Sequence, residues 1–354
     1  MKTIRVGIIG QGRSGLDIHA HHLATVPRKF RIVAVADLIA DRCKEAERDL
    51  GCESSTNYRD LLKRRDLDLI VNATPSHLHV PITKEVLRAG FNVLCEKPLA
   101  RRAREVDDLI AASKKARRLL AVYQQSRFSP YFVKIRQIID SGVIGRVVMV
   151  KMANNGYSRR WDWQTLQSMN GGNLLNTGPH PVDQALVFFD AGGAMPKVWS
   201  EMTAVNTFGD AEDHVKLILS GKGHPTIDME ISSCCAYPTY STQVYGTCGG
   251  VTWKGPAVTW RYFNPKRAPR QRVISKPMPG RRYCGEKLPW VEKTWEKPMT
   301  VGEMFDYMAG KFYDNLYAVM TRRAPLEVTP RQVRRQIAVI EEAHKQNPLP
   351  RRRS

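Results

Sequence analysis

The sequence predicts an α/β protein of two domains, in which a doubly wound parallel sheet is followed by an α+β domain with a large open, mainly antiparallel sheet. Three observations lead to this prediction. Strands alternate with helices over the first 125 residues, a glycine-rich turn joins the first strand to the first helix, and strand patterns in series follow Ser129–Pro130. A length of 354 residues is sufficient for two packed cores.

Residues 1–125 contain short apolar runs separated by helix patterns, which is typical of a parallel sheet covered on both faces. The predicted strands are Ile4–Ile9, Ile32–Ala36, Leu67–Asn72, Asn92–Cys95 and Leu119–Tyr123. The predicted helices are Gly15–Thr25, Ala40–Leu50, Val80–Ala89 and Ala103–Ala116. This alternation predicts a doubly wound first domain over residues 1–125.

Residues 126–354 show a different rhythm, with one early helix pattern at Tyr131–Ser141 and few helices among the strands that follow. The predicted strands are Val147–Met152, Val198–Asn206, His214–Leu219, Thr226–Ser233, Ser241–Tyr245 and Val251–Thr252. Phe263–Lys297 is rich in Pro, Arg and Lys and is predicted to be an extended loop. Helix patterns at Met304–Arg322 and Thr329–Gln346 close the chain, the second with Thr329 as N-cap.

The chain is strongly basic, with 55 Lys and Arg against 34 Asp and Glu, a net charge of +21. The basic residues form short groups along the whole chain, such as Arg281-Arg282 and Arg351-Arg352-Arg353, and no helix-turn-helix, zinc-finger or RNP pattern accompanies them. We therefore interpret most of them as solvated surface and expect no specific nucleic-acid partner. The positive field could alternatively attract an acidic or nucleic-acid partner.

The cysteines and the N-terminus indicate the compartment. The seven cysteines contain no Cys-x-x-Cys pair, so we expect reduced thiols and no metal site. No apolar stretch approaches the ~20 residues of a membrane helix, and MKTIRVGIIGQG lacks the apolar region of a secretory signal. The sequence thus predicts a cytoplasmic protein without a membrane segment.

The first strand pattern leads into Gly10-Gln11-Gly12-Arg13-Ser14-Gly15, and Asp37 follows the next strand pattern. In a G-x-G-x-x-G turn the first glycine permits the tight turn, the second lets the backbone approach a pyrophosphate, and the third allows close helix–strand packing. Asp37 is expected to accept hydrogen bonds from the adenosine ribose and to repel a 2′-phosphate. We therefore predict a dinucleotide cofactor, with NAD preferred over NADP.

Two polar segments follow later strand patterns, Thr74-Pro75-Ser76-His77-Leu78-His79 and Glu96-Lys97-Pro98. Because ligands of open α/β sheets bind beyond the carboxyl ends of the strands, both segments are expected on the cofactor edge. Pro98 restricts Lys97 to extended backbone angles and so fixes the direction of its amine. A lysine beside a nicotinamide and an alcohol, with its pKa lowered, can transfer a proton.

The segment Gly171–Asp183 is the densest polar cluster of the second half. His180 and Asp183 are one helical turn apart and share a face. Together with Asn176 and Thr177, after a pair of glycines, they predict a polar binding wall.

Five segments in order along the chain resemble landmarks of the Gfo/Idh/MocA family, the glucose–fructose oxidoreductase and inositol dehydrogenase group: Gly10–Gly15, Thr74-Pro75 with His79, Glu96-Lys97-Pro98, Gln125-Ser126-Arg127-Phe128 and Gly171–Asp183. The resemblance covers nearly the whole chain. It implies an N-terminal Rossmann domain, a C-terminal sheet that often mediates oligomerisation, and NAD(P)-dependent oxidation of a hydroxyl on a sugar or cyclitol. A homo-oligomer, either dimer or tetramer, is therefore expected.

The resemblance also implies roles for individual residues. Lys97 and His180 match the catalytic pair, and the implied substrate contacts are Lys97, Arg127, Asn176, Thr177, His180 and Asp183. The expected cofactor contacts are Gly10, Gln11, Gly12, Arg13, Ser14, Gly15, Asp37, Thr74, Pro75, His77, His79, Glu96, Lys97, Gln125 and Trp163. Inositol dehydrogenase-like members carry aspartate at the position of Asn176. Because a neutral amide cannot support an imidazolium, we assign the main base to Lys97.

The resulting hypothesis is hydride transfer between NAD and a secondary hydroxyl or ketone of a sugar, glycoside or cyclitol. Two alternatives remain open. One is a redox-neutral cycle in which NAD oxidises a sugar transiently, a glycosidic bond is eliminated, and the hydride returns. The other is a non-catalytic nucleotide-binding sensor that recruits an acidic or nucleic-acid partner.

Overall fold

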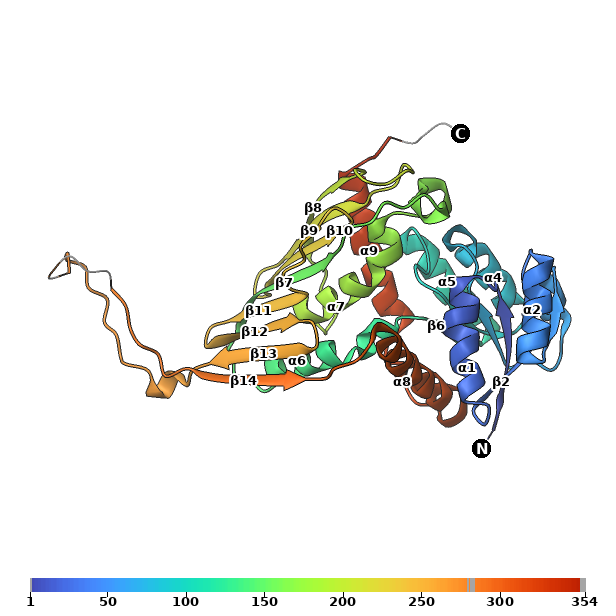
Figure 1. The fold of residues 1–354 in the computed structure, drawn as a ribbon, viewed down its shortest axis with the longest axis horizontal. Helices are drawn as coiled ribbons and strands as arrows, with labels where there is room; N and C mark the ends of the chain where they lie inside the picture. The colour runs from blue at the N-terminus through green and yellow to red at the C-terminus, as the bar shows by residue number, and fades with distance from the viewer. Residues whose placement is uncertain (1, 279, 281–283, 351–354) are drawn as a thin grey trace.

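The computed structural model describes residues 2–278, 280 and 284–350. Over these residues the chain forms a six-stranded and an eight-stranded sheet (Figure 1). This confirms the predicted fold class, because a doubly wound parallel sheet precedes a mixed, mainly antiparallel one. The basic groups Arg281-Arg282 and Arg351–Arg353 lie outside the described residues.

The first sheet has the strand order β3-β2-β1-β4-β5-β6, and its neighbours are parallel. Its strands are β1 (Ile4–Ile9), β2 (Phe30–Ala36), β3 (Glu53–Ser55), β4 (Leu69–Asn72), β5 (Asn92–Cys95) and β6 (Leu120–Val122). Its helices are η1 (Ser14–Ala20), α1 (His21–Thr25), α2 (Ala40–Leu50), α3 (Arg59–Lys63), η2 (Ser76–Leu78), α4 (His79–Arg88) and α5 (Ala103–Ala116). The order reverses between β1 and β4, so the carboxyl ends of these strands form the crevice in which doubly wound folds bind ligands.

The second sheet has the order β14-β13-β12-β11-β7-β10-β9-β8, in which β7 and β10 are parallel and the other neighbours antiparallel. Its strands are β7 (Val147–Asn155), β8 (Lys197–Thr203), β9 (His214–Ser220), β10 (Thr226–Ser232), β11 (Thr242–Gly246), β12 (Gly249–Lys254), β13 (Ala257–Tyr262) and β14 (Val291–Glu296). Val215, Leu217 and Leu219 of β9 are buried, whereas the residues between them are half-exposed. The sheet therefore packs on one face only.

Helices of the second half fill the space between the two sheets. The segments are η3 (Gln125–Phe128), α6 (Pro130–Asp140), η4 (Trp163–Thr165), η5 (Gln167–Met169), η6 (Asn173–Thr177), α7 (Pro179–Phe189) and α9 (Pro330–Gln346). α7 packs on β7 and β10, and α9 lies between β8 and α5 (Figure 1). The start of α9 has the predicted N-cap, Thr329, which accepts a hydrogen bond from the backbone N–H of Gln332.

Helix α8 (Val301–Arg322) comes late in the chain but packs against the first sheet's side of the molecule (Figure 1). Its buried residues Phe312, Tyr313, Leu316 and Tyr317 share an apolar cluster with residues of β1 and β2. The ring of Tyr313 stacks on His22 and lies edge-on to Phe30. α8 therefore completes the packing around the helix that follows the glycine turn.

The structure corrects the predicted elements in several places, and α3 and α7 are helices that the predicted ranges did not include. Strand β3 was not predicted because it is short, polar and at a sheet edge. Strand β13 was also missed. Strand β14 lies inside the stretch Phe263–Lys297 that was predicted to be loop, because the exposed, charged residues of β14 lack an apolar alternation. The start of the predicted helix Gly15–Thr25 is a π-helix. None of the described helices is both long enough and apolar enough to cross a membrane.

Candidate active site

The glycine turn after β1 is built from close backbone contacts. Gly10 has a φ of 94°, and a Cβ on it would lie 2.6 Å from the carbonyl oxygen of Ala73. A Cβ on Gly15 would lie 1.8 Å from the carbonyl oxygen of Gly10. A Cβ on Gly12, by contrast, would meet only the Arg42 guanidinium, at 3.8 Å. Gly10 and Gly15 are thus required by the fold, whereas Gly12 keeps open the side from which a pyrophosphate would approach.

Five buried polar atoms at the carboxyl ends of the first sheet's strands have no hydrogen-bond partner among the described residues. They are Gln11 Oε1 after β1, His77 Nδ1 after β4, and Tyr123 Oη, Gln124 Oε1 and Gln125 Oε1 after β6. Buried polar groups are normally paired, so orphaned atoms along one edge indicate a polar ligand. Gln11, His77 and Gln125 were predicted cofactor contacts, and together with the open face of Gly12 they fit a dinucleotide.

Asp37 holds the glycine turn in place. Its Oδ2 accepts a hydrogen bond of 2.7 Å from the backbone N–H of Gln11, and its Oδ1 accepts one of 2.9 Å from Ile39. The Arg42 guanidinium lies 3.5 Å from the same carboxylate and is 42% exposed. A guanidinium therefore stands beside the carboxylate that was predicted to read the adenosine ribose.

Lys97 joins the two halves of the site. It follows β5, and its amine donates a 3.0 Å hydrogen bond to the backbone carbonyl of Asn176 in η6. Four residues later His180, in α7, has its Nδ1 3.1 Å from the hydroxyl of Ser126. Lys97 thus contacts the second half four residues before His180, the other predicted catalytic residue.

The electrostatics of this cluster favour neutral bases. Burial lowers the pKa of Lys97, and the positive charges of Arg13 and Arg160 act in the same direction, while Glu96 opposes them. Burial and the charge of Lys97 lower the pKa of His180 to about 3. The imidazole is therefore neutral at physiological pH and can exchange hydrogen bonds without competing for a proton.

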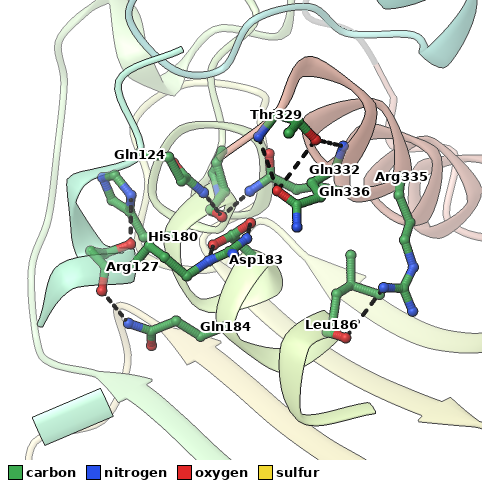
Figure 2. Close-up of polar contacts among 12 residues, drawn as sticks. Gln124, Arg127, His180, Asp183, Gln184, Leu186, Thr329, Gln332, Arg335 and Gln336 are labelled. Atoms are coloured by element: carbon green, nitrogen blue, oxygen red, sulfur yellow. Dashed lines mark hydrogen bonds and ion pairs between the residues drawn. The ribbon is translucent and has the colours of Figure 1, made fainter. Parts of the chain in front are cut away.

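Arg127 and Asp183, both predicted to contact substrate, are paired with each other instead of standing free (Figure 2). The guanidinium donates two hydrogen bonds of 2.6 Å, one to each carboxylate oxygen, and the side chains are only 9% and 2% exposed. Nearby, Gln184 donates to the carbonyl of Ser126 and Gln124 to that of Pro179. These contacts fix the start of α7, and hence His180, against η3 (Figure 2).

The other predicted residues occupy different positions. Both ring nitrogens of His79 are used inside the protein, at 2.7 Å from the carbonyl of Pro98 and 2.8 Å from that of Thr74. Pro75 precedes η2, Trp163 begins η4, and Thr177 ends η6, the last two half-buried. Ser14 is half-buried at the start of η1, whereas Arg13 is exposed.

Sequence reasoning missed His19, Tyr313 and Arg160. His19 and Tyr313 are buried, polar and hydrogen-bonded to each other at 2.7 Å across 294 positions. A pattern search could have found that His19 lies on the sheet-facing side of its helix, but not its distant partner. Arg160 lines a small polar cavity beside Asn176, and nothing in its local sequence indicates that position.

The strand order and the glycine turn define a dinucleotide-binding fold, and half-buried Lys97 lies at its ligand-binding edge. The comparison with known families gives the particular family. Residues 4–124 match the oxidoreductase family with an NAD-binding Rossmann fold, GFO_IDH_MocA, and residues 132–252 match the GFO/IDH/MocA C-terminal domain. The chain belongs to the Gfo/Idh/MocA family.

Curated relatives include enzymes of different chemistry. An inositol 2-dehydrogenase/D-chiro-inositol 3-dehydrogenase of Lactiplantibacillus plantarum is 29% identical over 182 residues, 51% of this chain and 50% of that protein. A 2,7-anhydro-N-acetylneuraminate hydratase of Mediterraneibacter gnavus is 26% identical over 263 residues, 71% of this chain and 67% of that protein. The match with the Lactiplantibacillus dehydrogenase thus spans half of its length.

Solved structures share the fold over almost the whole chain. The WlbA dehydrogenase of Bordetella pertussis, in complex with NADH and UDP-GlcNAcA, is 20% identical with a TM-score of 0.77, over 98% of this chain and 96% of that one. An NAD-binding protein of Listeria innocua is 19% identical with a TM-score of 0.78, over 99% and 100%.

The buried Arg127–Asp183 pair leads to a stability prediction. Asp183→Asn leaves the guanidinium buried without its counter-charge, so the free energy of unfolding is expected to fall by about 3–5 kcal/mol. The double variant Arg127→Met/Asp183→Leu, which removes both charges, should remain closer to the unaltered protein. Urea denaturation measures both. Unchanged stability of Asp183→Asn would contradict a structural role for the pair.

Proposed function

We propose that the protein is an NAD-dependent dehydrogenase that oxidises a secondary hydroxyl of a sugar, glycoside or cyclitol to a ketone, or reduces the ketone in reverse. Residues 1–125 would hold the dinucleotide and residues 126–354 the substrate. The observation that carries this proposal is the desolvated amine of Lys97, held at the Asn176 carbonyl beside the glycine turn. The proposed localisation remains cytoplasmic, and the uncovered face of the second sheet is the proposed surface for homo-oligomers.

NAD⁺, when bound, supplies the hydride acceptor. The amine of Lys97, when in its neutral form, accepts the hydroxyl proton as the C–H hydride leaves the substrate carbon, so proton and hydride are both accounted for. The neutral imidazole of His180 donates or accepts a hydrogen bond and orients the hydroxyl. Ser126, hydrogen-bonded to the other side of the ring, fixes its orientation.

A small cavity beside Asn176 is compatible with a hydroxyl-bearing substrate. Its lining includes the polar side chains of Ser158, Arg160, Gln164 and Asp213. Its volume of about 20 Å³ has room for roughly one water, so it could receive a single hydroxyl of a substrate and not a whole sugar ring. The inositol dehydrogenase relative and the WlbA complex with a UDP-sugar are consistent with this class.

A second candidate is the redox-neutral cycle, favoured by the 26% identity with a 2,7-anhydro-N-acetylneuraminate hydratase. In that cycle the same Lys97 removes and returns protons while the hydride moves to the cofactor and back. No net NADH accumulates.

A substrate panel separates the two candidates. Monosaccharides, glycosides, uronates and cyclitols are each incubated with NAD⁺ or NADP⁺. The dehydrogenase proposal predicts NADH formation, measured by absorbance, with at least one of them. Product formed without any absorbance change, detected by chromatography, would instead identify the redox-neutral cycle.

Lys97→Ala should lower turnover by about 100- to 10,000-fold, because it removes the proton acceptor. NADH binding, measured by fluorescence, should stay near the unaltered value. Lys84→Ala is the control, since the amine of Lys84 lies 2.9 Å from Asp108 on the surface. Full activity of Lys97→Ala would overturn the assignment of the base.

The preference for NAD is proposed to rest on Asp37, and the adjacent Arg42 guanidinium could bind a 2′-phosphate if Asp37 were replaced. Asp37→Ser removes the charge that repels a 2′-phosphate and leaves the Arg42 guanidinium unpaired, so NADPH should bind at least tenfold more tightly, about 1.4 kcal/mol. Fluorescence titration with NADH and NADPH measures both affinities. Adding Arg42→Ala to Asp37→Ser should abolish the gain, and a gain that survives would exclude Arg42 as its source.

A further inference from the structure

A buried hydrogen-bonded chain runs from α8 to the residue before Lys97. The hydroxyl of Tyr313 lies 2.7 Å from His19 Nδ1, and His19 Nε2 lies 3.1 Å from Glu96 Oε1. The second oxygen of Glu96 accepts a 3.0 Å hydrogen bond from the backbone N–H of Lys97. Three elements far apart in the sequence therefore meet beneath the proposed base.

The chemistry of the partners fixes the direction of these hydrogen bonds. Ionised Glu96 can only accept, so His19 Nε2 carries a proton and donates it. The Tyr313 hydroxyl faces the other ring nitrogen of His19, Nδ1. Burial raises the pKa of Tyr313 well above its ordinary value, so the phenol keeps its proton. The hydroxyl can therefore donate at Nδ1, which polarises the ring and strengthens the hydrogen bond that His19 Nε2 donates to Glu96.

Glu96 is ionised although it is buried. Burial acts to raise its pKa, but the hydrogen bond from His19 and the electrostatic interactions with His19, Lys97 and His79 outweigh burial and bring the pKa to about 2. An isolated buried carboxylate would be costly, so His19 is what allows a full negative charge beside Lys97. That charge in turn raises the pKa of the Lys97 amine against the effect of burial.

The surroundings leave the chain little freedom. His19 is fully buried, and its ring lies edge-on to Tyr123 at 4.6 Å and to Tyr313 at 6.1 Å between centroids. Tyr313 also stacks on His22. Because the rings are held by packing, loss of one hydroxyl would change the hydrogen bonds more than the fold.

We propose that Tyr313 is a positioning residue for Lys97, acting through His19 and Glu96. The inference rests on the proposed function of Lys97 as proton acceptor. α8 would thereby influence the active site through hydrogen bonds that reach Lys97. The role of Tyr313 is to set how strongly the negative charge of Glu96 acts on the Lys97 amine. The other groups that affect or face this amine are the positive charges of Arg13 and Arg160 and the neutral ring of His180.

The test is Tyr313→Phe, which keeps the ring and removes one hydroxyl. His19 then loses the hydrogen bond at Nδ1, so its Nε2–H becomes a weaker donor to Glu96, and the less neutralised charge of Glu96 acts more strongly on Lys97. The pKa of the Lys97 amine should rise by about 0.5–1 unit, and kcat at neutral pH should fall about three- to tenfold as the neutral fraction falls. Affinity for NADH should not change.

Tyr317→Phe is the matched control, one turn further along α8, where the hydroxyl donates a 2.9 Å hydrogen bond to the backbone carbonyl of Lys2. The pKa is read by NMR of ¹³C-methylated lysines, with the Lys97 signal identified by its loss in Lys97→Ala. A shift in Tyr313→Phe no larger than in Tyr317→Phe would overturn the proposal.

A double-variant cycle tests the route. In the Glu96→Gln background, where the charge is already absent, Tyr313→Phe should cause no further shift of the Lys97 pKa. A shift of the same size in both backgrounds would mean that Tyr313 acts by another path, against the proposal. If the unaltered protein oxidises no substrate of the panel, the proposed function fails, and the NMR titration alone still decides this inference.

Discussion

The site depends on one hydrogen bond between the two halves of the chain, from the Lys97 amine to the carbonyl of Asn176. Lys97 sits at the carboxyl end of a parallel strand, where the first sheet can expose it, and Asn176 belongs to the segment that begins α7. The proposed chemistry therefore depends on how η6 and α7 pack against the first sheet. The pKa of the Lys97 amine depends in turn on how closely the two halves approach each other.

Most of the fold could be predicted because its signals are local. The boundaries of Ala40–Leu50 and Ala103–Ala116 are confirmed at both ends, since apolar periodicity and helix propensity agree there. Strands β3 and β14 gave no such signal: both are edge strands whose polar residues look like loop. These residues form strands because a neighbouring strand pairs with them, and this pairing cannot be predicted from the local sequence.

The site was partly predictable for the same reason. Glycines that a fold requires are visible in a motif, as Gly10 and Gly15 are. Whether a charged residue is paired is not visible in a motif, and no local pattern indicates that Asp183 is held by Arg127 across 56 positions. His19 and Tyr313, paired across 294 positions, lie wholly outside any local pattern. Such long-range polar pairs cannot be predicted from local sequence patterns.

Asn176 in place of an aspartate is consistent with this electrostatic arrangement. Its contact with Lys97 comes from the backbone, so a change of its side chain does not remove that hydrogen bond. His180, with a pKa of about 3, is neutral whenever Lys97 is a usable base and needs no carboxylate to support an imidazolium. A second anion there would raise the pKa of Lys97 further, in addition to the charge of Glu96. Neutral Asn176 thus leaves Glu96, supported by His19, as the adjacent anion that opposes the effect of burial on the amine.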